Sequence, residues 1–353
     1  GIKAGSEFLV NTETASFQGN PSIAIDADGD FVIAWQSYLQ DGDFYGVYAQ
    51  RYTADGSPAG TEFQVNTETA SFQWKPSIAM DADGDFVIAW ESELQDLSGD
   101  GIYAQRYTAD GSPAGSEFQV NTETSNNQTN PRIAMDADGD FVITWVSNLQ
   151  DGDGYGVYAQ RYTADGIKAG SEFLVNTETA SFQGNPSIAI DADGDFVIAW
   201  TSELQDLSGD GIYAQRYTAD GSPAGSEFQV NTETSNNQTN PRIAMDADGD
   251  FVIAWQSNLQ DGDGDGIYAQ RYTADGIKAG TEFQVNTETS DQQRSSSIVM
   301  DADGDFVIAW ESYDQVQVGS SNDIFAQRYK GASQTVDLNL VVQDDVDPVA
   351  PGG

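Results

Sequence analysis

An eight-residue string, Asp-Ala-Asp-Gly-Asp-Phe-Val-Ile, recurs along the chain at a fixed spacing. Its copies begin 55 residues apart, at Asp26, Asp81, Asp136, Asp191, Asp246 and Asp301. Six copies of one unit therefore fill residues 1–330. A fixed period of this kind indicates a solenoid, a propeller or another array in which each unit buries its apolar faces on its neighbours.

Each unit contains four short segments typical of β-strands and none typical of a helix. In the second copy these segments are 77–80, 86–90, 101–107 and 117–121. They are rich in β-branched and aromatic residues and are bounded by Gly, Asp, Asn or Pro. Four strands per unit predict an all-β fold, namely a six-bladed β-propeller of four-stranded antiparallel blades.

Polarity predicts the order of the strands within a blade. The side chains of segment 86–90 are apolar on both faces of the strand, as expected for an inner strand between blades. Those of segment 117–121 alternate between polar and apolar. We therefore expect 77–80 to be innermost and 117–121 outermost. With this order the N-terminal strand, 7–11, would join the C-terminal blade at 323–329 and close the ring. The rival order would give six self-contained blades.

Two recurring side chains are expected to be structural. Trp90 and its counterparts end the second strand of every blade, which predicts a place in the core between blades. Arg106 and its counterparts lie in the third strand, where we expect them to pair with a nearby Asp.

The turn after the third strand shows a resemblance to a known family. Thr53-Ala54-Asp55-Gly56 recurs in the next four copies, and it resembles the Asp-box turn (Ser/Thr-x-Asp-x-Gly-x-Thr-Trp) of sialidase-like propellers. Residues 76–90 also resemble repeats of that superfamily. The resemblance covers all six repeats, although Ser-Pro-Ala or Ile-Lys-Ala replaces the Thr-Trp half of the box. It implies the propeller fold and supports the strand order.

The composition excludes several kinds of chemistry. The chain has 57 Asp and Glu against 14 Lys and Arg, a formal charge of −43, and neither Cys nor His. Disulfides, thiolate or imidazole metal sites and a Ser-His-Asp triad are therefore excluded. The charge disfavours nucleic acid as a partner, and no apolar run is long enough for membrane insertion. A bound metal would be a hard, oxygen-bound ion such as Ca²⁺.

Two acidic patterns allow a calcium interpretation. Asp26, Asp28 and Asp30 have the i, i+2, i+4 spacing of the first half of many calcium loops, and this pattern recurs in each repeat. The alternative is a β-hairpin whose Gly adopts positive φ. The sequence that contains Asp261, Asp263 and Asp265 matches the beginning of an EF-hand calcium loop. Its twelfth position is Tyr272 instead of Glu, which favours a solvated loop without a metal.

One face of the propeller is expected to differ from blade to blade. The turns after the first and third strands are nearly constant, whereas the loops after the second and fourth strands vary and share one face. A ligand-binding face and the drift of long loops both explain this variation. The exceptional residues on this face, our candidate ligand-binding residues, are Tyr38, Tyr45, Trp74, Lys75, Arg132, Tyr155, Arg242, Arg294 and Tyr313.

These features predict a non-enzymatic binding or structural module of an extracellular or cell-surface protein. A glycan or a protein would be its ligand, the ring would be monomeric within a longer chain, and residues 331–353 would form an acidic linker. A sialidase-like glycoside hydrolase is one alternative, but such chemistry needs a Tyr/Glu pair beside an arginine cluster, and near-identical blades offer no unique pair. A recently duplicated or engineered scaffold without a ligand is the other.

Overall fold

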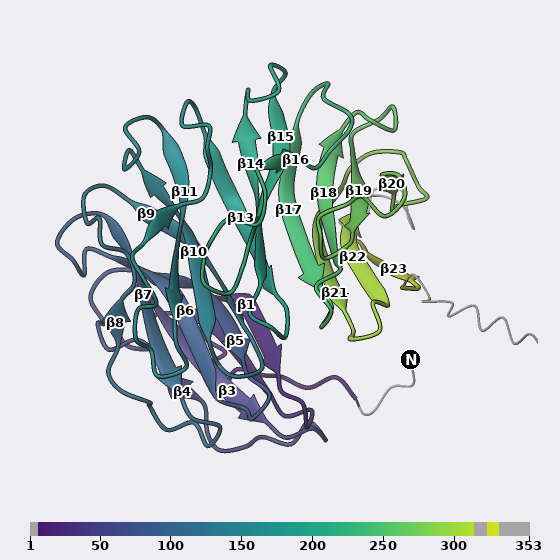
Figure 1. The fold of residues 1–353 in the computed structure, drawn as a ribbon. Helices are drawn as coiled ribbons and strands as arrows, with labels where there is room; N and C mark the ends of the chain where they lie inside the picture. Colours follow the sequence, from purple (N-terminus) through teal and green to yellow (C-terminus); the bar gives the residue numbers. More distant parts are fainter. Residues whose placement is uncertain (1–5, 314–322, 332–353) are drawn as a thin grey trace, which may run out of the picture.

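The computed structural model describes residues 6–313 and 323–331, and these residues form six β-sheets that radiate around a common centre (Figure 1). Five sheets have four antiparallel strands, and the sixth has three. The described residues contain no helix, and therefore none that is long and apolar enough to cross a membrane. The predicted six-bladed, all-β propeller is confirmed.

The strands fall into four sets according to their place in the blade. The innermost strands are β1 (Gln18–Ile25), β5 (Gln73–Met80), β9 (Gln128–Met135), β13 (Gln183–Ile190), β17 (Gln238–Met245) and β21 (Gln293–Met300). The second strands are β2 (Phe31–Tyr38), β6 (Phe86–Glu93), β10 (Phe141–Asn148), β14 (Phe196–Glu203), β18 (Phe251–Asn258) and β22 (Phe306–Ser312). The third strands are β3 (Tyr45–Tyr52), β7 (Asp100–Tyr107), β11 (Tyr155–Tyr162), β15 (Asp210–Tyr217), β19 (Asp265–Tyr272) and β23 (Asp323–Tyr329). The outer strands are β4 (Phe63–Gln64), β8 (Phe118–Gln119), β12 (Phe173–Leu174), β16 (Phe228–Gln229) and β20 (Phe283–Gln284).

The predicted strand order is confirmed. The second blade has the order β5-β6-β7-β8, and each innermost strand packs against the innermost strand of the next blade, from β1 through to β21. The innermost strands begin earlier than expected because each contains a bulge. In β5 the register shifts between Trp74 and Ser77, and Lys75 within the bulge has a φ of 50°.

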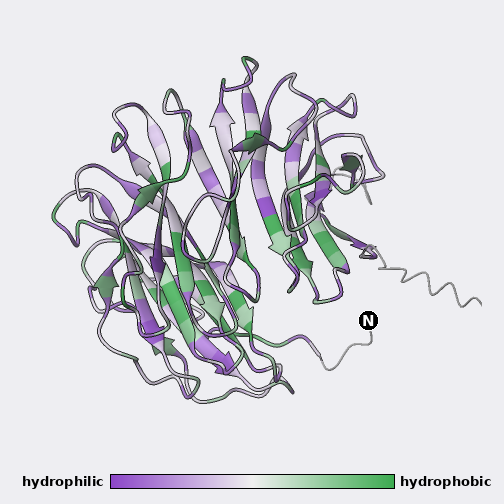
Figure 2. Ribbon diagram, viewed as in Figure 1, coloured by the Kyte–Doolittle hydropathy of each residue, from purple (hydrophilic) through white to green (hydrophobic). Residues whose placement is uncertain are grey.

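The core lies between blades, where the apolar second strands pack against one another (Figure 2). Trp90 is fully buried and belongs to a cluster that joins Val32 and Ala34 of the first blade to Ile88 of the second. The expected interblade position of the recurring tryptophans is therefore confirmed.

The expected pairing of the recurring arginines with Asp is found for Arg328, whose Nη2 lies 2.8 Å from Asp305 Oδ2, whereas the arginines of the first four copies bind backbone oxygens of the next blade instead. Arg106 donates from Nη1 to the backbone oxygen of Asp165 in the next blade, at 2.6 Å, and to that of Ala114 in its own blade, at 3.3 Å. Arg161 donates in the same way to the backbone oxygen of Asp220. A guanidinium has several donors in a fixed fork, so it can satisfy the carbonyls of two turns at once and link neighbouring blades.

The expected closure by the N-terminal strand is wrong in this structure. Phe8 lies against Tyr52 of the first blade with ring centroids 5.2 Å apart, and the backbone nitrogen of Thr12 donates to Glu62 at 2.7 Å. Among the described residues no fourth strand pairs with β23, so Ile324 is 73% exposed while its counterpart Ile267 is fully buried. Phe63 and Thr67 make the same contacts with Tyr107 and Glu117 of the following blade, so the N-terminal segment lies beside the first blade as an outer strand would, and among the described residues only its pairing with β23 is not formed. The predicted linker at 331–353 lies, beyond residue 331, outside the described residues.

Candidate functional site

A cavity of about 630 Å³ lies at the centre of the propeller. Residues of β1, β5, β9, β17 and β21 line it, mostly at the bulges where these strands begin. The residue after the bulge proline is Ser in four of the six copies, as at Ser22 and Ser77. In the third and fifth copies it is Arg132 and Arg242, so two guanidinium groups take the place of two hydroxyls.

Arg132 and Arg242 are half-buried, and neither forms an ion pair among the described residues. Each donates from Nη1 to the carbonyl oxygen of the proline before it, at 2.9 Å. The pKa of Arg132 is lowered to about 10, mainly by burial and also by the charge of Arg242, while Glu91 acts in the opposite direction. Burial also lowers the pKa of Arg242. Both side chains remain cationic at neutral pH, and an anion in the cavity would relieve their repulsion.

Lys75 brings a third cation to the cavity and connects it to a buried carboxyl group. Its Nζ lies 3.0 Å from Glu91 Oε1 and donates to Asn130 Oδ1 at 3.2 Å. The backbone nitrogen of Asn130 donates to the same Oε1 of Glu91 at 2.5 Å. The other oxygen, Oε2, is buried and has no hydrogen-bond partner among the described residues. Burial raises the pKa of Glu91, and the charge of Lys75 opposes this rise.

The sequence analysis missed Glu91, although comparison of the copies could have found it. Its counterparts in the second strand are Gln36, Val146, Thr201, Gln256 and Glu311. Gln36 shows the structural role of this position, because its Oε1 accepts a hydrogen bond from the backbone nitrogen of Lys75 in the next blade at 3.1 Å. A glutamine is enough to accept this hydrogen bond from the next blade. The buried carboxyl group of Glu91 is ionisable, and the structural role does not require an ionisable group.

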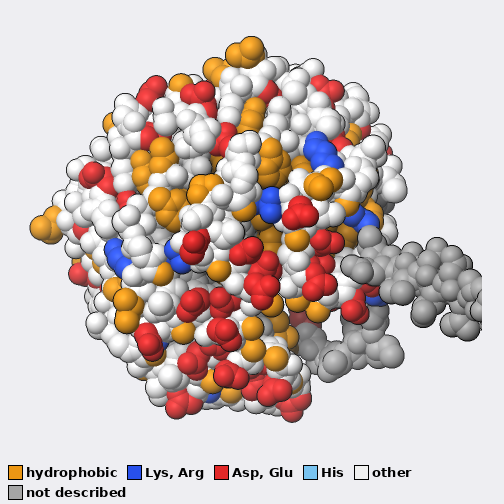
Figure 3. All heavy atoms as spheres, viewed as in Figure 1, with side chains coloured by type: hydrophobic (Ala, Val, Ile, Leu, Met, Phe, Trp, Pro, Cys, Tyr) orange, Lys and Arg blue, Asp and Glu red, His pale blue; other side chains and the backbone are white. Residues whose placement is uncertain are grey.

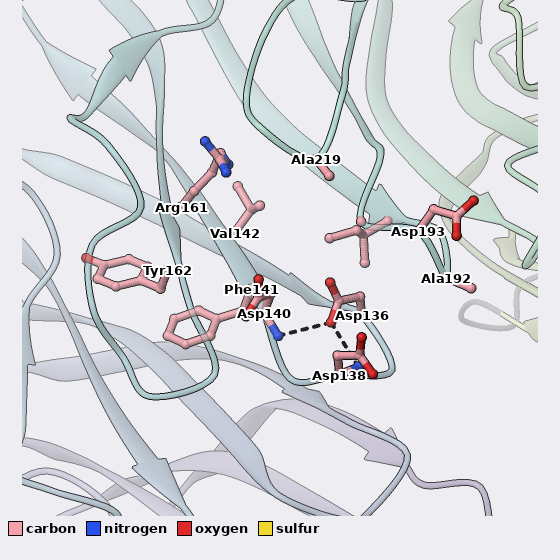
Figure 4. Close-up of a pocket in the computed structure, with 12 residues that line it drawn as sticks. Asp136, Asp138, Asp140, Phe141, Val142, Arg161, Tyr162, Ala192, Asp193 and Ala219 are labelled. Atoms are coloured by element: carbon pink, nitrogen blue, oxygen red, sulfur yellow. Dashed lines mark hydrogen bonds between the residues drawn. The ribbon is translucent and has the colours of Figure 1, made fainter.

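The structure does not support calcium at the recurring Asp turns. Asp26 Oδ1 accepts from the backbone nitrogens of Asp28 and Asp30, at 3.0 and 2.9 Å, and the turn at Asp136 is the same (Figure 4). Asp30 Oδ1 accepts from the backbone nitrogen of Ala54 at 2.8 Å. Within the described ranges no group of three or more acidic side chains is arranged to hold a metal ion. The hairpin interpretation is favoured, because backbone amides engage the oxygens that a metal would need.

The second acidic pattern is likewise a set of loop contacts. Asp261 Oδ2 accepts from Gln284 Nε2 at 3.0 Å, and Asp261 Oδ1 accepts from the backbone nitrogen of Asp263 at 3.4 Å. Asp265 Oδ1 accepts from Asn258 Nδ2 at 2.9 Å. Each carboxylate thus has a different partner, and the three do not converge on one point.

The other candidate ligand-binding residues divide into two groups. Tyr38, Tyr45 and Trp74 lie together beside Lys75, whose Nζ is 5.4 Å from the Trp74 ring centroid. The remaining three lie apart from the cavity lining: Arg294 pairs with Glu311 at 3.4 Å, Tyr155 lies against Phe182, and Tyr313 is 43% exposed. The structure therefore brings together Lys75, Arg132 and Arg242, with the three aromatic residues next to them.

No family model matches the sequence, and no curated protein matches it. Solved structures do share its fold. A protein of unknown function from Dyadobacter fermentans aligns with a TM-score of 0.59 and 12% identity, over 91% of this chain and 96% of that one. An α-L-arabinanase of Penicillium chrysogenum, complexed with arabinobiose, aligns with a TM-score of 0.56 and 13% identity, over 89% and 93%. A microbial sialidase, Hadza Hz136, aligns with a TM-score of 0.53 and 10% identity, over 89% and 65%.

These similarities place the chain among propellers of the fold that glycan-acting enzymes use. At such identities they show the fold and not the activity. They nevertheless correct the expectation of a non-enzymatic module, because the arabinanase and the sialidase are enzymes and favour the glycosidase alternative. The similarity to sialidase propellers is confirmed for the fold, whereas the Asp-box likeness itself stays a prediction.

Proposed function

We propose that this protein is a glycan-processing enzyme of the glycoside hydrolase class, and that it acts on a sugar carrying an acidic group. One observation carries the proposal: Arg132 and Arg242 face a single central cavity, and neither has a carboxylate partner among the described residues. The surface is strongly acidic (Figure 3) and the net charge is −43, so cations left without partners favour an anionic ligand group.

The residues around the cavity would divide the chemistry between them. The two guanidiniums would bind the carboxylate or sulfate of the sugar, because planar donors suit such oxygens. Glu91 is fully buried and reaches the cavity only through Lys75 and Asn130, so we assign it a positioning role: it holds Lys75, which lines the cavity. Lys75 contacts Glu91 at Oε1, while Oε2 stays without a hydrogen-bond partner among the described residues.

The balance of charges at the cavity also favours a second reaction. Three cations reach the cavity, but among the described residues no carboxylate lines it; Glu91 contacts the lining through Lys75 and Asn130. Hydrolysis commonly uses two carboxyl groups. β-Elimination at a uronic acid instead needs cations that neutralise the carboxylate and acidify the adjacent C–H bond. A lyase activity is therefore the alternative within the same substrate class.

A polymeric acidic glycan is a substrate found outside cells, so the proposal includes an extracellular or cell-surface location. Calcium is not needed by the proposed chemistry.

The test is an activity screen on acidic glycans that separates the two reactions. Polygalacturonate and sialyllactose would be incubated with the protein, and both reducing ends and the ultraviolet absorbance of unsaturated sugars would be measured. Hydrolysis gives the first signal alone, and elimination gives both. The matched variants are Arg132→Ser, Arg242→Ser and Glu91→Gln, since other copies carry Ser or Gln at these positions. Activity that survives all three changes would refute the assignment of this cavity.

A further inference from the structure

Six aromatic side chains gather on the variable face where the first two blades meet. We call them the aromatic cluster: Phe17, Tyr38, Phe44, Tyr45, Phe72 and Trp74. Their rings form a continuous chain of contacts. Centroids are 4.7 Å apart for Phe44 and Phe72, 5.1 Å for Phe72 and Trp74, and 4.9 Å for Tyr38 and Tyr45. Tyr45 lies between the two groups, 5.8 Å from Phe72.

The aromatic cluster is open to solvent, unlike the aromatic residues of the core. Phe17 is 57% exposed and Phe44 is 41% exposed, whereas the core residue Trp90 is fully buried. The other members of the cluster are half-buried. Aromatic rings in such a position leave a large apolar surface in contact with water, which favours a function in binding.

The propeller fold does not require these residues, because other copies fold without them. The counterparts of Phe44 are Gly99, Gly154, Gly209 and Gly264. The counterparts of Trp74 are Gly19, Thr129, Gly184, Thr239 and Arg294. Those of Tyr45 are Asp100, Tyr155, Asp210 and Asp265. The contact between Tyr45 and Phe72 recurs once, between Tyr155 and Phe182, but without a counterpart of Phe44 or Trp74. Among the described residues the full aromatic cluster is therefore confined to one pair of blades.

The aromatic cluster is continuous with the central cavity. Trp74 precedes Lys75 in the bulge of β5, and Lys75 Nζ lies 5.4 Å from the Trp74 ring centroid while the residue lines the cavity. Lys75 also contacts Glu91. A ligand that occupies the cavity and extends toward Lys75 thus meets Trp74 first and Tyr45 next, at a centroid distance of 6.4 Å from Trp74.

We propose that the aromatic cluster is a sugar-binding subsite for the units of a glycan chain next to the unit held in the cavity. Sugar rings present C–H groups to aromatic faces, and exposed aromatic side chains stack on them. The tyrosine hydroxyls of Tyr38 and Tyr45 provide polar contacts at the edge. The inference rests on the proposed function in one respect: it makes the substrate an oligosaccharide or polysaccharide instead of a single sugar.

The chain offers a direct optical readout of this subsite. Six of its seven tryptophans are buried in the core, at Trp35, Trp90, Trp145, Trp200, Trp255 and Trp310. Trp74 is the only tryptophan outside the core. A ligand that stacks on the cluster should therefore change the fluorescence of Trp74 alone, and Trp74→Phe should remove the change.

The experiment titrates the full chain with galacturonic acid and its oligomers, sialyllactose and arabino-oligosaccharides, using calorimetry beside fluorescence. We expect affinity to rise with chain length for at least one series. Trp74→Thr and Tyr45→Asp should each lower the affinity for the long oligomer at least tenfold and leave that for the single sugar unchanged. The matched control is Tyr155→Asp, the same substitution at the equivalent position of the third copy, which lies outside the cluster.

The outcomes separate this inference from the proposed function. Length-dependent binding without cleavage would support the subsite and refute the enzyme. Cleavage that Trp74→Thr and Tyr45→Asp leave unchanged for long oligomers would refute the subsite and support the enzyme. Length-independent binding, equal losses in Tyr45→Asp and Tyr155→Asp, or no Trp74 signal with any of the three series would each overturn the subsite.

Discussion

Arg132 and Arg242 come from blades that are not adjacent, yet both line one cavity, and the charge of Arg242 adds to the burial that lowers the pKa of Arg132 to about 10. Two cations held in this way repel each other, and burial removes part of their hydration. They are therefore not explained as stabilising contacts, and this is why they point to a ligand that the protein binds.

The first prediction concerns this pair. Arg132→Ser and Arg242→Ser should each lower kcat/KM on an acidic glycan about 10- to 100-fold, the range expected for the loss of a charge-assisted hydrogen bond. Thermal unfolding should stay unchanged or shift upward, because the like-charge repulsion disappears and Ser already occupies this position in four copies. Melting curves and steady-state kinetics measure the two effects. A variant that loses stability and keeps its activity would assign the arginines a structural role instead.

The second prediction concerns the pH dependence of stability through Glu91. Burial raises the pKa of this carboxyl above its ordinary value near 4.5, so the folded state holds the proton more tightly than the unfolded state. Stability should therefore fall as the pH rises from about 4.5 through the higher pKa of the folded state. Glu91→Gln removes this contribution, so the variant should gain melting temperature relative to the wild type across that window. The difference in melting temperature between the variant and the wild type reports on Glu91 alone, because the other acidic groups are the same in both. A difference that does not change with pH would contradict the prediction.

The third prediction concerns the N-terminal segment. Deleting residues 1–14 removes the Phe8 contact with Tyr52 and the hydrogen bond from Thr12 to Glu62, so it should lower the free energy of unfolding by about 1–2 kcal/mol. Phe8→Ala should give part of this loss, since Phe8 packs against Tyr52. Denaturant unfolding measures both variants. An equal free energy for the deletion and the wild type would show that the segment does not pack on the first blade in solution.

The fourth prediction concerns the Asp turns and metal. Because Asp136 Oδ1 accepts hydrogen bonds from Asp138 and Asp140, we expect equal melting temperatures in millimolar calcium and in chelator. Asp136→Asn keeps the accepting oxygen and should be tolerated. Asp136→Ala leaves two turn amides without their partner and should cost about 1–2 kcal/mol. A calcium-dependent melting temperature that Asp136→Asn abolishes would restore the calcium interpretation.

The repeat made the fold predictable, but not its closure. The recurring Asp-Gly turns and the apolar second strands predict the blade and the strand order, because hydrophobic alternation is a local property of the sequence. The segment containing Phe8 packs on Tyr52 as Phe63 packs on Tyr107 of the next blade, but it does not form the backbone pairing with β23 that Phe63 forms with β3. The paired part of an outer strand is only two residues long, so a sequence pattern alone could not decide whether that pairing forms.

The candidate site was predictable where single residues stand out. Arg132, Arg242 and Lys75 differ from their counterparts in charge, and the strand order predicts that they share a face. Glu91 was not predicted from the sequence, because two other copies have Gln at this position. The property that makes it a candidate is the burial of its carboxyl group, which the sequence does not show. Phe44 and Phe72 come from different loops, so their contact at 4.7 Å follows from the angle between blades and from no local pattern.

No strand of the described residues pairs with the outer edge of β23, so the association of this protein should depend on ionic strength. An exposed strand edge that includes Ile324 is a template for pairing with another molecule, whereas a charge of −43 keeps molecules apart. Salt shortens the range of that repulsion to about 10 Å at 0.1 M, less than the width of the molecule. At low ionic strength, charge repulsion should keep the molecules apart. At high salt concentration, the strand edges of two molecules should be able to pair.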